Sequence, residues 1–406
     1  MFKILYTLFL VVSAIFSRVM LVGPISVRHV MAVVMMVYCI VIGEFKSDKF
    51  IKWYLVFLFF YALSNIVTGY TVEVLSKLFG TYFPALILYL ATKTMIQKYD
   101  GINWIVYTVL AIAILDSVVT IGQFYNNPIA RTICEFLRGD EFKEDLYVYY
   151  ERHENLQGRS AAGLLGAVLN GYFLSAVCIL GLYNKEGKPK VINWALFMFF
   201  AFALFLVQER SGLYFGLLCV FIYVFLTSVT NKKSIITIML VLPIVLFLIA
   251  RHGSSLVSLD DTRYVTQAMD GGGRESLAAG GWLFLEHHPL GGIMEFHALG
   301  NRDSHNAVTN AFLFGGIFGG IVVLSIIFAQ LWAIIKILYK SFQQRRYSFA
   351  LIVFSLMYLD FTLNSFFHNA SLMSGNFLFF LAWGVIVSLL EKENYPDRKL
   401  SKLSIS

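Results

Sequence analysis

Long apolar runs alternate with short polar segments along almost the whole chain. A helix that crosses a bilayer needs about 20 mostly apolar residues. The pattern therefore predicts twelve membrane-spanning helices. They cover residues 4–22, 27–43, 53–70, 74–92, 103–124, 161–182, 192–208, 211–229, 235–250, 306–335, 348–366 and 374–390. Lys77 and Pro84 interrupt the fourth of these runs.

Composition supports the same class. Hydrophobic residues make up 58% of the chain and charged residues only 14%, whereas a soluble domain carries about 25% charged residues. We therefore expect an all-α polytopic membrane protein that forms one transmembrane domain over residues 1–406. Its basic residues lie scattered in short loops, which gives no continuous surface for nucleic acid. The first 22 residues lack a small-residue cleavage site, so we interpret them as a retained span.

The distribution of Lys and Arg predicts the orientation of the chain. One set of short segments and both termini hold 19 of these residues, and the short segments on the other side hold four. Cytoplasmic loops are enriched in Lys and Arg. We therefore expect both termini in the cytoplasm, and two large outer loops at 125–160 and 251–304. Nucleotides are not freely available outside, and the chain has no GxxxxGK[ST] phosphate loop.

The segment from 251 to 320 is the longest interruption of the apolar pattern and holds five of the eight histidines. His305 and Asn306 directly precede a glycine-rich span. A neutral imidazole at that position can take a proton from a hydroxyl group, or it can simply bond a carbonyl at the interface. His288 is expected at a helix end, and His368 lies on the same side of the membrane.

Two arginines stand out by their position. Arg210 lies between two spans with almost no room for a loop, where an ionised residue is costly and usually functional. Arg274 follows three glycines and precedes a helical run. A cation beside a helix N-terminus is unfavourable unless an anion is shared. Both positions suit a phosphate group. The alternatives are a tight turn in which Arg210 pairs with Glu209, and a solvated loop arginine at 274.

Asp116 and Asp360 are isolated acids inside predicted spans. Such residues form proton relays in transporters, or they pair with basic residues.

The order of four short elements along the chain carries more information than any one of them. Gly158, Arg159 and Gly163 open a span, and Gln208, Arg210, Ser211 and Gly212 separate two spans. Arg274 then precedes a helix that ends in the sequence HPLGG (288–292). The last element is HN followed by a glycine-rich span, with His305, Asn306, Gly315, Gly316 and Gly319. Over residues 155–325 this order resembles the O-antigen ligase and O-antigen polymerase superfamily of bacterial envelope glycan transferases.

The resemblance implies a glycosyltransferase-C-like fold in the bacterial inner membrane, with the active site on the periplasmic face. It implies a glycan donor linked to undecaprenyl diphosphate, an acceptor hydroxyl, and transfer with inversion and without a metal or other cofactor. Arg210 and Arg274 would bind the diphosphate with help from Arg159, and His305 would be the general base. His288, His368 and Asn306 are secondary candidates.

The leading hypothesis is a polymerase that joins lipid-linked repeat units, so that the donor and the acceptor are both undecaprenyl-diphosphate glycans. A chain-length regulator protein is then an expected partner, beside membrane lipid. The first alternative is a ligase that transfers the polymer to the lipid A core. The second, from a different class, is a polysaccharide flippase or transporter that uses the intramembrane acids.

Overall fold

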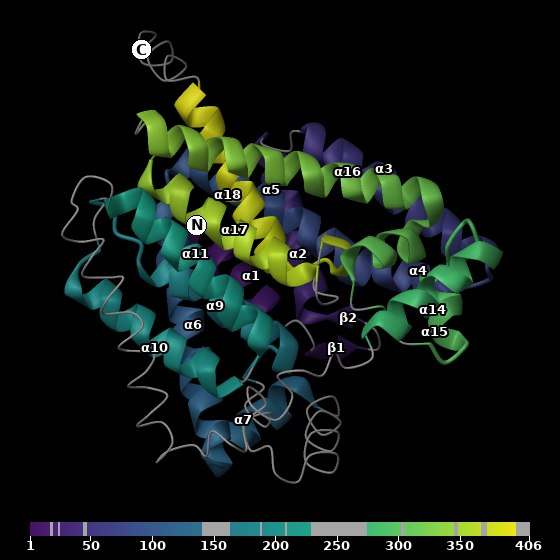
Figure 1. The fold of residues 1–406 in the computed structure, drawn as a ribbon, viewed down its shortest axis with the longest axis horizontal. Coiled ribbons are helices and arrows are strands. Elements are labelled where there is room, and N and C mark those ends of the chain that lie inside the picture. Colours follow the sequence, from purple (N-terminus) through teal and green to yellow (C-terminus); the bar gives the residue numbers. More distant parts are fainter. Residues whose placement is uncertain are drawn as a thin grey trace.

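The computed structural model describes residues 1–16, 19–22, 25–43, 47–139, 163–186, 189–207, 209–228, 274–301, 304, 306–344, 348–366 and 372–394. Within them the chain is almost entirely helical (Figure 1). Its first half contains α1 (Phe2–Ala14), α2 (Val27–Val41), α3 (Lys49–Val67), α4 (Thr71–Lys77), the π-helix η1 (Leu78–Tyr82), α5 (Phe83–Tyr99), α6 (Ile102–Phe124) and α7 (Pro128–Arg138). Its second half contains α9 (Ala167–Gly181), α10 (Val191–Val207), α11 (Arg210–Ser228), α14 (Arg274–His287), α15 (Ile293–Ala298), α16 (Ala307–Gln344), α17 (Phe349–Ser365), the 3₁₀ turn η4 (Leu372–Ser374) and α18 (Phe377–Asn394). A small antiparallel hairpin of β1 (Met20–Val22) and β2 (Ile25–Ser26) joins α1 to α2.

The described helices include four that are long and apolar enough to cross a membrane, namely Lys49–Val67, Thr71–Tyr99, Ile102–Phe124 and Ala307–Gln343. Shorter apolar helices accompany them. These helices indicate a multi-pass membrane protein. Eleven of the twelve predicted spans correspond to helices or helix pairs, and the predicted span at 235–250 lies outside the described residues. The first helix is shorter than predicted because the chain turns into the β1–β2 hairpin before residue 22.

The helices run back and forth between two ends of one bundle. At one end, which we call the basic end, one ion pair joins α5 to the residue before α3, and another joins α18 to the turn between α5 and α6. Lys93 Nζ lies 2.6 Å from Asp48 Oδ2, and Lys392 Nζ lies 2.7 Å from Asp100 Oδ1. Burial alone would raise the pKa of Asp48, but hydrogen bonds from Lys93, from Tyr89 and from the Ile51 N–H group outweigh it and lower that pKa.

The opposite end, which we call the motif end, holds the starts of α9, α11 and α16, together with the hairpin, η1, α14 and α15. They lie there because successive helices run in opposite directions. Helix α6 begins at the basic end, where Asn103 bonds Tyr183 just after α9. Its other end contacts the segment at 163–166, just before α9. Segments that the Lys and Arg distribution assigns to opposite sides of the membrane thus lie at opposite ends of the bundle.

Lys77 and Pro84, which interrupt the apolar run of the fourth predicted span, do not break the helix. Helix α4, the π-helix η1 and α5 follow one another directly, with helical dihedral angles where they join, and form one long apolar helix over Thr71–Tyr99. The π-helical turn lies between Lys77 and Pro84.

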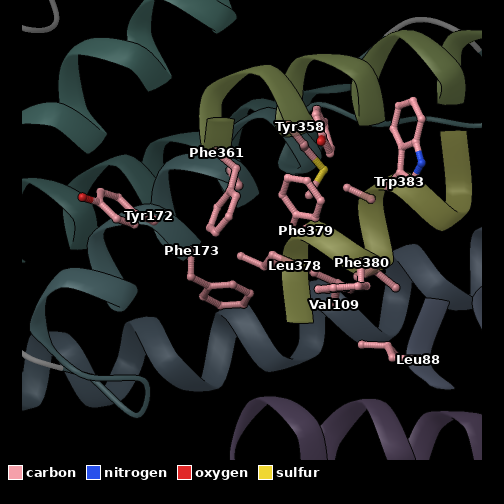
Figure 2. Close-up of a cluster of buried hydrophobic side chains, with 14 of the residues drawn as sticks. Leu88, Val109, Tyr172, Phe173, Tyr358, Phe361, Leu378, Phe379, Phe380 and Trp383 are labelled. Carbon is pink, nitrogen blue, oxygen red and sulfur yellow. The ribbon is translucent and has the colours of Figure 1, made fainter. Parts of the chain in front are cut away.

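Figure 2 shows the centre of the bundle, where aromatic and aliphatic side chains from α5, α6, α9, α17 and α18 meet. Tyr358 on α17 packs with its ring centroid 4.8 Å from that of Phe379 and 5.3 Å from that of Trp383, both on α18. On the α9 side, Tyr172 contacts Phe361 edge to face, with a centroid separation of 6.2 Å. These contacts fix α17 and α18 against α9.

Helices α9 and α11 approach each other so closely that their small residues are required. A Cβ atom at Gly212 would lie 2.9 Å from the carbonyl oxygen of Gly171, and one at Gly216 would lie 2.5 Å from Ser175 Oγ. Gly171 and Ser175 are four residues apart on α9, as Gly212 and Gly216 are on α11. This is the small-residue spacing that lets two membrane helices pack at the backbone. It places the first turn of α11 directly on α9.

Replacing Gly212 with Ala is expected to destabilise the protein by about 1–3 kcal/mol, because the new methyl group overlaps a backbone carbonyl. Thermal unfolding of the purified protein in detergent measures the effect. Gly280→Ala in α14 is the matched control, since a Cβ there meets nothing within 4 Å. It should stabilise the helix by about 0.5–1 kcal/mol. Equal unfolding temperatures for the two variants would contradict the close packing of α9 and α11.

Candidate functional site

Helix α14, whose first residue is Arg274, packs across the start of α16. The contact is close, because a Cβ atom at Gly281 would lie 2.7 Å from Thr309 Cγ2. One residue further, the Trp282 ring lies 5.4 Å from that of Phe312. The helix that begins at Arg274 therefore runs beside the helix that begins immediately after Asn306.

Helix α16 is broken one-quarter of the way along, where Gly315 and Gly316 leave helical geometry. A broken helix leaves backbone groups without partners, and inside a membrane these must be satisfied by protein. The turn that follows α14 satisfies two of them. The Gly292 N–H group donates to the Leu313 carbonyl at 3.0 Å, and the Ile317 N–H group donates to the Pro289 carbonyl at 3.1 Å. We call this arrangement of residues 288–292 against the break the turn–break junction.

Glycine is required on both sides of the turn–break junction. A Cβ at Gly291 would lie 2.6 Å from the Gly316 nitrogen, and one at Gly316 would overlap the Leu290 carbonyl. Both glycines also have positive φ, +79° and +64°, a region that other residues rarely adopt. The glycines of the HPLGG sequence and of the glycine-rich span, more than 20 residues apart in the chain, thus form one structural unit.

Asn65, which is completely buried on α3, ties this unit to the rest of the bundle. Its Oδ1 accepts from the Met294 N–H group at 3.0 Å, at the start of α15. Its Nδ2 donates to the Phe314 carbonyl at 3.5 Å, at the break in α16, and to the Tyr61 carbonyl at 2.8 Å. One side chain therefore supplies hydrogen-bond partners both to the start of α15 and to the break in α16. An Asn inside a predicted apolar span is the sequence signal that points to it, and our sequence analysis did not use that signal.

His288 begins the turn and is held by its neighbours. Its ring stacks on Phe284 with centroids 4.3 Å apart. Its Nδ1 lies 3.4 Å from Glu295 Oε2. The prediction that the chain reaches a helix end at this histidine is confirmed, because α14 ends at His287. The observed contacts give His288 a role in shaping the turn.

Asn306 caps α16. Its Oδ1 accepts from the N–H groups of Val308 at 2.8 Å and Thr309 at 3.3 Å, as an N-cap residue does. Ser304, also buried, donates through Oγ to Asn310 Oδ1 at 2.7 Å. The residues on both sides of position 305 are thus bonded into the first turns of α16.

Arg210 is the first residue of α11, and hydrogen bonds connect the turn that follows it to α9 and α17. Ser175 Oγ on α9 lies 2.7 Å from the Gly212 carbonyl and 2.9 Å from Asp360 Oδ1 on α17. Asn364 Nδ2 also donates to Asp360 Oδ1, at 3.1 Å. The buried acid Asp360 therefore connects α17, through Ser175, to the first turn of α11.

Asp116 holds the segment at 163–166 that follows Arg159 in the sequence. Its Oδ1 accepts from the Leu164 N–H group at 2.8 Å. The orientation of the Asn170 amide that satisfies all its neighbours places Nδ2 2.5 Å from Asp116 Oδ2. Gln123, on the same helix as Asp116, accepts from the Gly163 N–H group at 2.8 Å. Asp116 thus bonds the described segment at 163–166 directly, whereas Asp360 reaches the first turn of α11 through Ser175.

Helix α7 packs on this segment. Cys134 Sγ donates to the Gly163 carbonyl at 3.3 Å, and burial raises the pKa of its thiol to about 12. The Arg138 guanidinium lies against Gly166, where a Cβ would come within 3.1 Å of Nη2. The predicted outer loop at 125–160 therefore begins with a helix that packs on the bundle.

The predicted site residues fall into three groups. Arg210 and Arg274 each begin a helix, as their sequence context predicted. His288 and Asn306 lie at the turn–break junction and at the start of α16. Arg159, His305 and His368 lie outside the described residues. In Figure 1, α14 and α15 lie at the right of the bundle, whereas α9, α10 and α11 lie at the left, with the β1–β2 hairpin between them.

Comparison of the chain with protein-family models, with curated proteins and with solved structures gave no match. Among the described residues, no group of three or more His, Cys, Asp or Glu side chains is arranged to hold a metal ion.

Asn65→Leu is expected to destabilise the protein by about 2–4 kcal/mol, because the Met294 N–H group and the Phe314 carbonyl lose a buried partner. Thermal unfolding in detergent and protease cleavage near residue 290 measure the loss. Ser64→Ala is the control, since Ser64 is equally buried and its Oγ has no partner among the described residues. If Asn65→Leu unfolds at the temperature of Ser64→Ala, Asn65 does not hold the junction.

Proposed function

We propose that this protein is an O-antigen polymerase-type glycosyltransferase of the bacterial inner membrane. The observation that carries the proposal is the turn–break junction. It joins the HPLGG turn to the glycine-rich span through two backbone hydrogen bonds. The elements that resemble the family in sequence therefore also depend on each other physically. With α14 beside α16, the helix that starts at Arg274 is held next to the helix that starts after His305.

The proposed orientation places the motif end in the periplasm, with both termini in the cytoplasm and twelve spans in total. The lysines of the basic end support this direction, because Lys and Arg accumulate on the cytoplasmic side. A transferase that works outside the cytoplasm cannot rely on nucleotides, so its donor sugar must already carry a good leaving group. A glycan on undecaprenyl diphosphate meets that need and reaches the site from within the membrane.

The proposed reaction is a single displacement. His305 takes the proton of an acceptor hydroxyl group on a second lipid-linked glycan, and that oxygen attacks the anomeric carbon of the donor sugar. The bond between the anomeric carbon and the phosphate oxygen breaks, with inversion, and undecaprenyl diphosphate leaves. Arg210, Arg274 and Arg159 bind the diphosphate and neutralise the charge that develops on it.

The described contacts give the remaining candidates supporting roles in this scheme. Asn306 sets the start of α16 next to His305, and His288 shapes the turn that fills the break. Arg210 lies at the first turn of α11, which Ser175 and Asp360 hold in place. Because a displacement of about 1 Å at a reacting group is enough to slow a reaction strongly, these supports matter for the rate.

Substitution of His305, Arg210 or Arg274 by Ala in a deletion strain is expected to abolish the long-chain lipopolysaccharide ladder, because each removes the base or a phosphate contact. Gel electrophoresis of lipopolysaccharide measures the effect, with membrane expression checked for each variant. The matched controls are His287→Ala, which alters an exposed histidine, and Arg131→Gln, which alters a partly exposed arginine, both at the same end of the bundle. A complete ladder in all three test variants would exclude the proposed site.

The same gel distinguishes the two reactions that the family performs. A core that carries a single repeat unit identifies a polymerase. A bare core, with polymer left on its lipid carrier, identifies a ligase that transfers finished polymer to the lipid A core.

The transporter alternative rests on Asp116 and Asp360, which are both completely buried. In the proposed enzyme they act through hydrogen bonds and need no change of charge. Asp360→Asn is therefore expected to keep at least half of the ladder, since the Asn amide can still form a hydrogen bond with the Ser175 hydroxyl group. Asp360→Leu is expected to lose the ladder, because it removes the bond to Ser175. Loss of the ladder in well-expressed Asp360→Asn would favour a proton relay instead.

A further inference from the structure

Arg28, in the first turn of α2, is a partly buried cation without an acidic partner among the described residues. Its guanidinium donates one hydrogen bond, to the carbonyl of Gly80 in the π-helix η1. Its Nε is buried and has no partner among the described residues, and no carboxylate of the described chain lies within ion-pair distance of it. An unpaired buried charge is costly. The structure therefore holds a positive charge whose counter-charge is not supplied by the neighbouring side chains that are described.

His29, the next residue, presents a second donor. Its Nδ1 accepts from the Ser26 N–H group at 2.8 Å. A backbone N–H group can only donate, so Nδ1 carries no proton and Nε2 carries it in the neutral ring. The capping contact between Ser26 and His29 thus fixes both the tautomer and the direction of the ring. No hydrogen-bond acceptor for Nε2 is present among the described residues.

The ends of both side chains meet at Gly80. Arg28 bonds the Gly80 carbonyl, and a Cβ atom at Gly80 would lie 3.1 Å from His29 Nε2. Gly80 has no positive φ, so its backbone does not require glycine. Because Gly80 has no side chain, the Nε2–H group of the His29 ring is left uncovered. A π-helical turn in an otherwise regular helix also occurs frequently at functional sites.

We propose that Arg28 and the Nε2–H group of His29 form a phosphate-binding site beside Gly80, separate from the three arginines of the proposed reaction. A guanidinium and an imidazole N–H group are both donors to phosphate oxygens. The site lies at the motif end, where α2 begins directly after the β1–β2 hairpin; Figure 1 shows that hairpin between α9 and α14. Helix ends such as the start of α2 lie at the level of the lipid headgroups in a membrane protein. The ligand is therefore a phosphate group carried by a lipid.

Two sources share this chemistry, namely the headgroup of an anionic phospholipid and the diphosphate of a polyprenyl lipid. The site does not depend on glycosyl transfer, and its binding test is therefore independent of the lipopolysaccharide ladder. A complete ladder in the His305, Arg210 and Arg274 variants, with phosphate binding that depends on Arg28, would overturn the proposed function alone. Phosphate binding that is unchanged in Arg28→Gln and Gly80→Ala, with the ladder lost in those three variants, would overturn this site alone.

The experiment titrates the purified full chain in detergent with sugar-free polyprenyl diphosphate, phosphatidylglycerol, inorganic diphosphate and diacylglycerol. Ligand-dependent thermal stabilisation gives an apparent Kd for each. The wild-type chain is expected to bind at least one phosphate-bearing probe and to bind diacylglycerol, which lacks phosphate, much more weakly. Arg28→Gln is expected to weaken phosphate binding about tenfold or more, as loss of a charge-assisted hydrogen bond does.

Gly80→Ala keeps the charge and covers Nε2, so it should weaken binding as well while leaving the helix folded. If Arg28→Gln does not fold, the affinity of Gly80→Ala for phosphate tests the proposed site. Arg131→Gln, which removes a partly exposed arginine at the same end, is the control and should bind like the wild type. Stabilisation by polyprenyl diphosphate alone identifies that lipid as the source, and stabilisation by phosphatidylglycerol identifies the headgroup. Equal binding of diacylglycerol, or wild-type affinity in both Arg28→Gln and Gly80→Ala, overturns the proposal.

Discussion

The arrangement of the motif end depends on the need to satisfy the backbone where α16 is broken. A helix interrupted inside a bilayer has carbonyl and N–H groups that water cannot reach. Here the turn at 288–292 and Asn65 provide their partners. Because the turn bonds both sides of the break, α14, α15 and the first two turns of α16 move together. The glycines at 291 and 316 follow from the same constraint, since only glycine allows the two backbones to approach so closely.

Buried polar residues in the bundle serve mainly to place helix ends. Asp116 bonds the segment at 163–166, and Asp360 acts through Ser175 on the start of α11. In an apolar surrounding such bonds are strong when every partner is present and costly when one is missing. This explains why isolated acids occur in these apolar helices. Interior polar groups thus position two of the predicted arginine-bearing segments, and surface loops need not do so.

Arg28 differs from these groups because its interactions within the described chain are incomplete. Asp116 accepts from a backbone N–H group and from an amide, whereas the Arg28 guanidinium has one carbonyl partner. The two cases separate polar residues that complete the fold from a residue that is poised for a ligand. Asn306 belongs to the residues that complete the fold, because its side-chain Oδ1 accepts hydrogen bonds from the first turn of α16.

The sequence by itself determined the class of the protein and most of its helices, but not the break in α16. Apolar runs and the helix starts at Arg210 and Arg274 follow from local composition and the length of a span, so each could be predicted. Tertiary structure decided which segments meet. Gly291 and Gly316 are 25 positions apart, and Asn65 lies more than 200 positions from the break that it bonds, so no local pattern reveals their contact. The convergence of Arg28 and His29 on Gly80 likewise required the fold, because a cation is recognised as unpaired only when its neighbours in space are known.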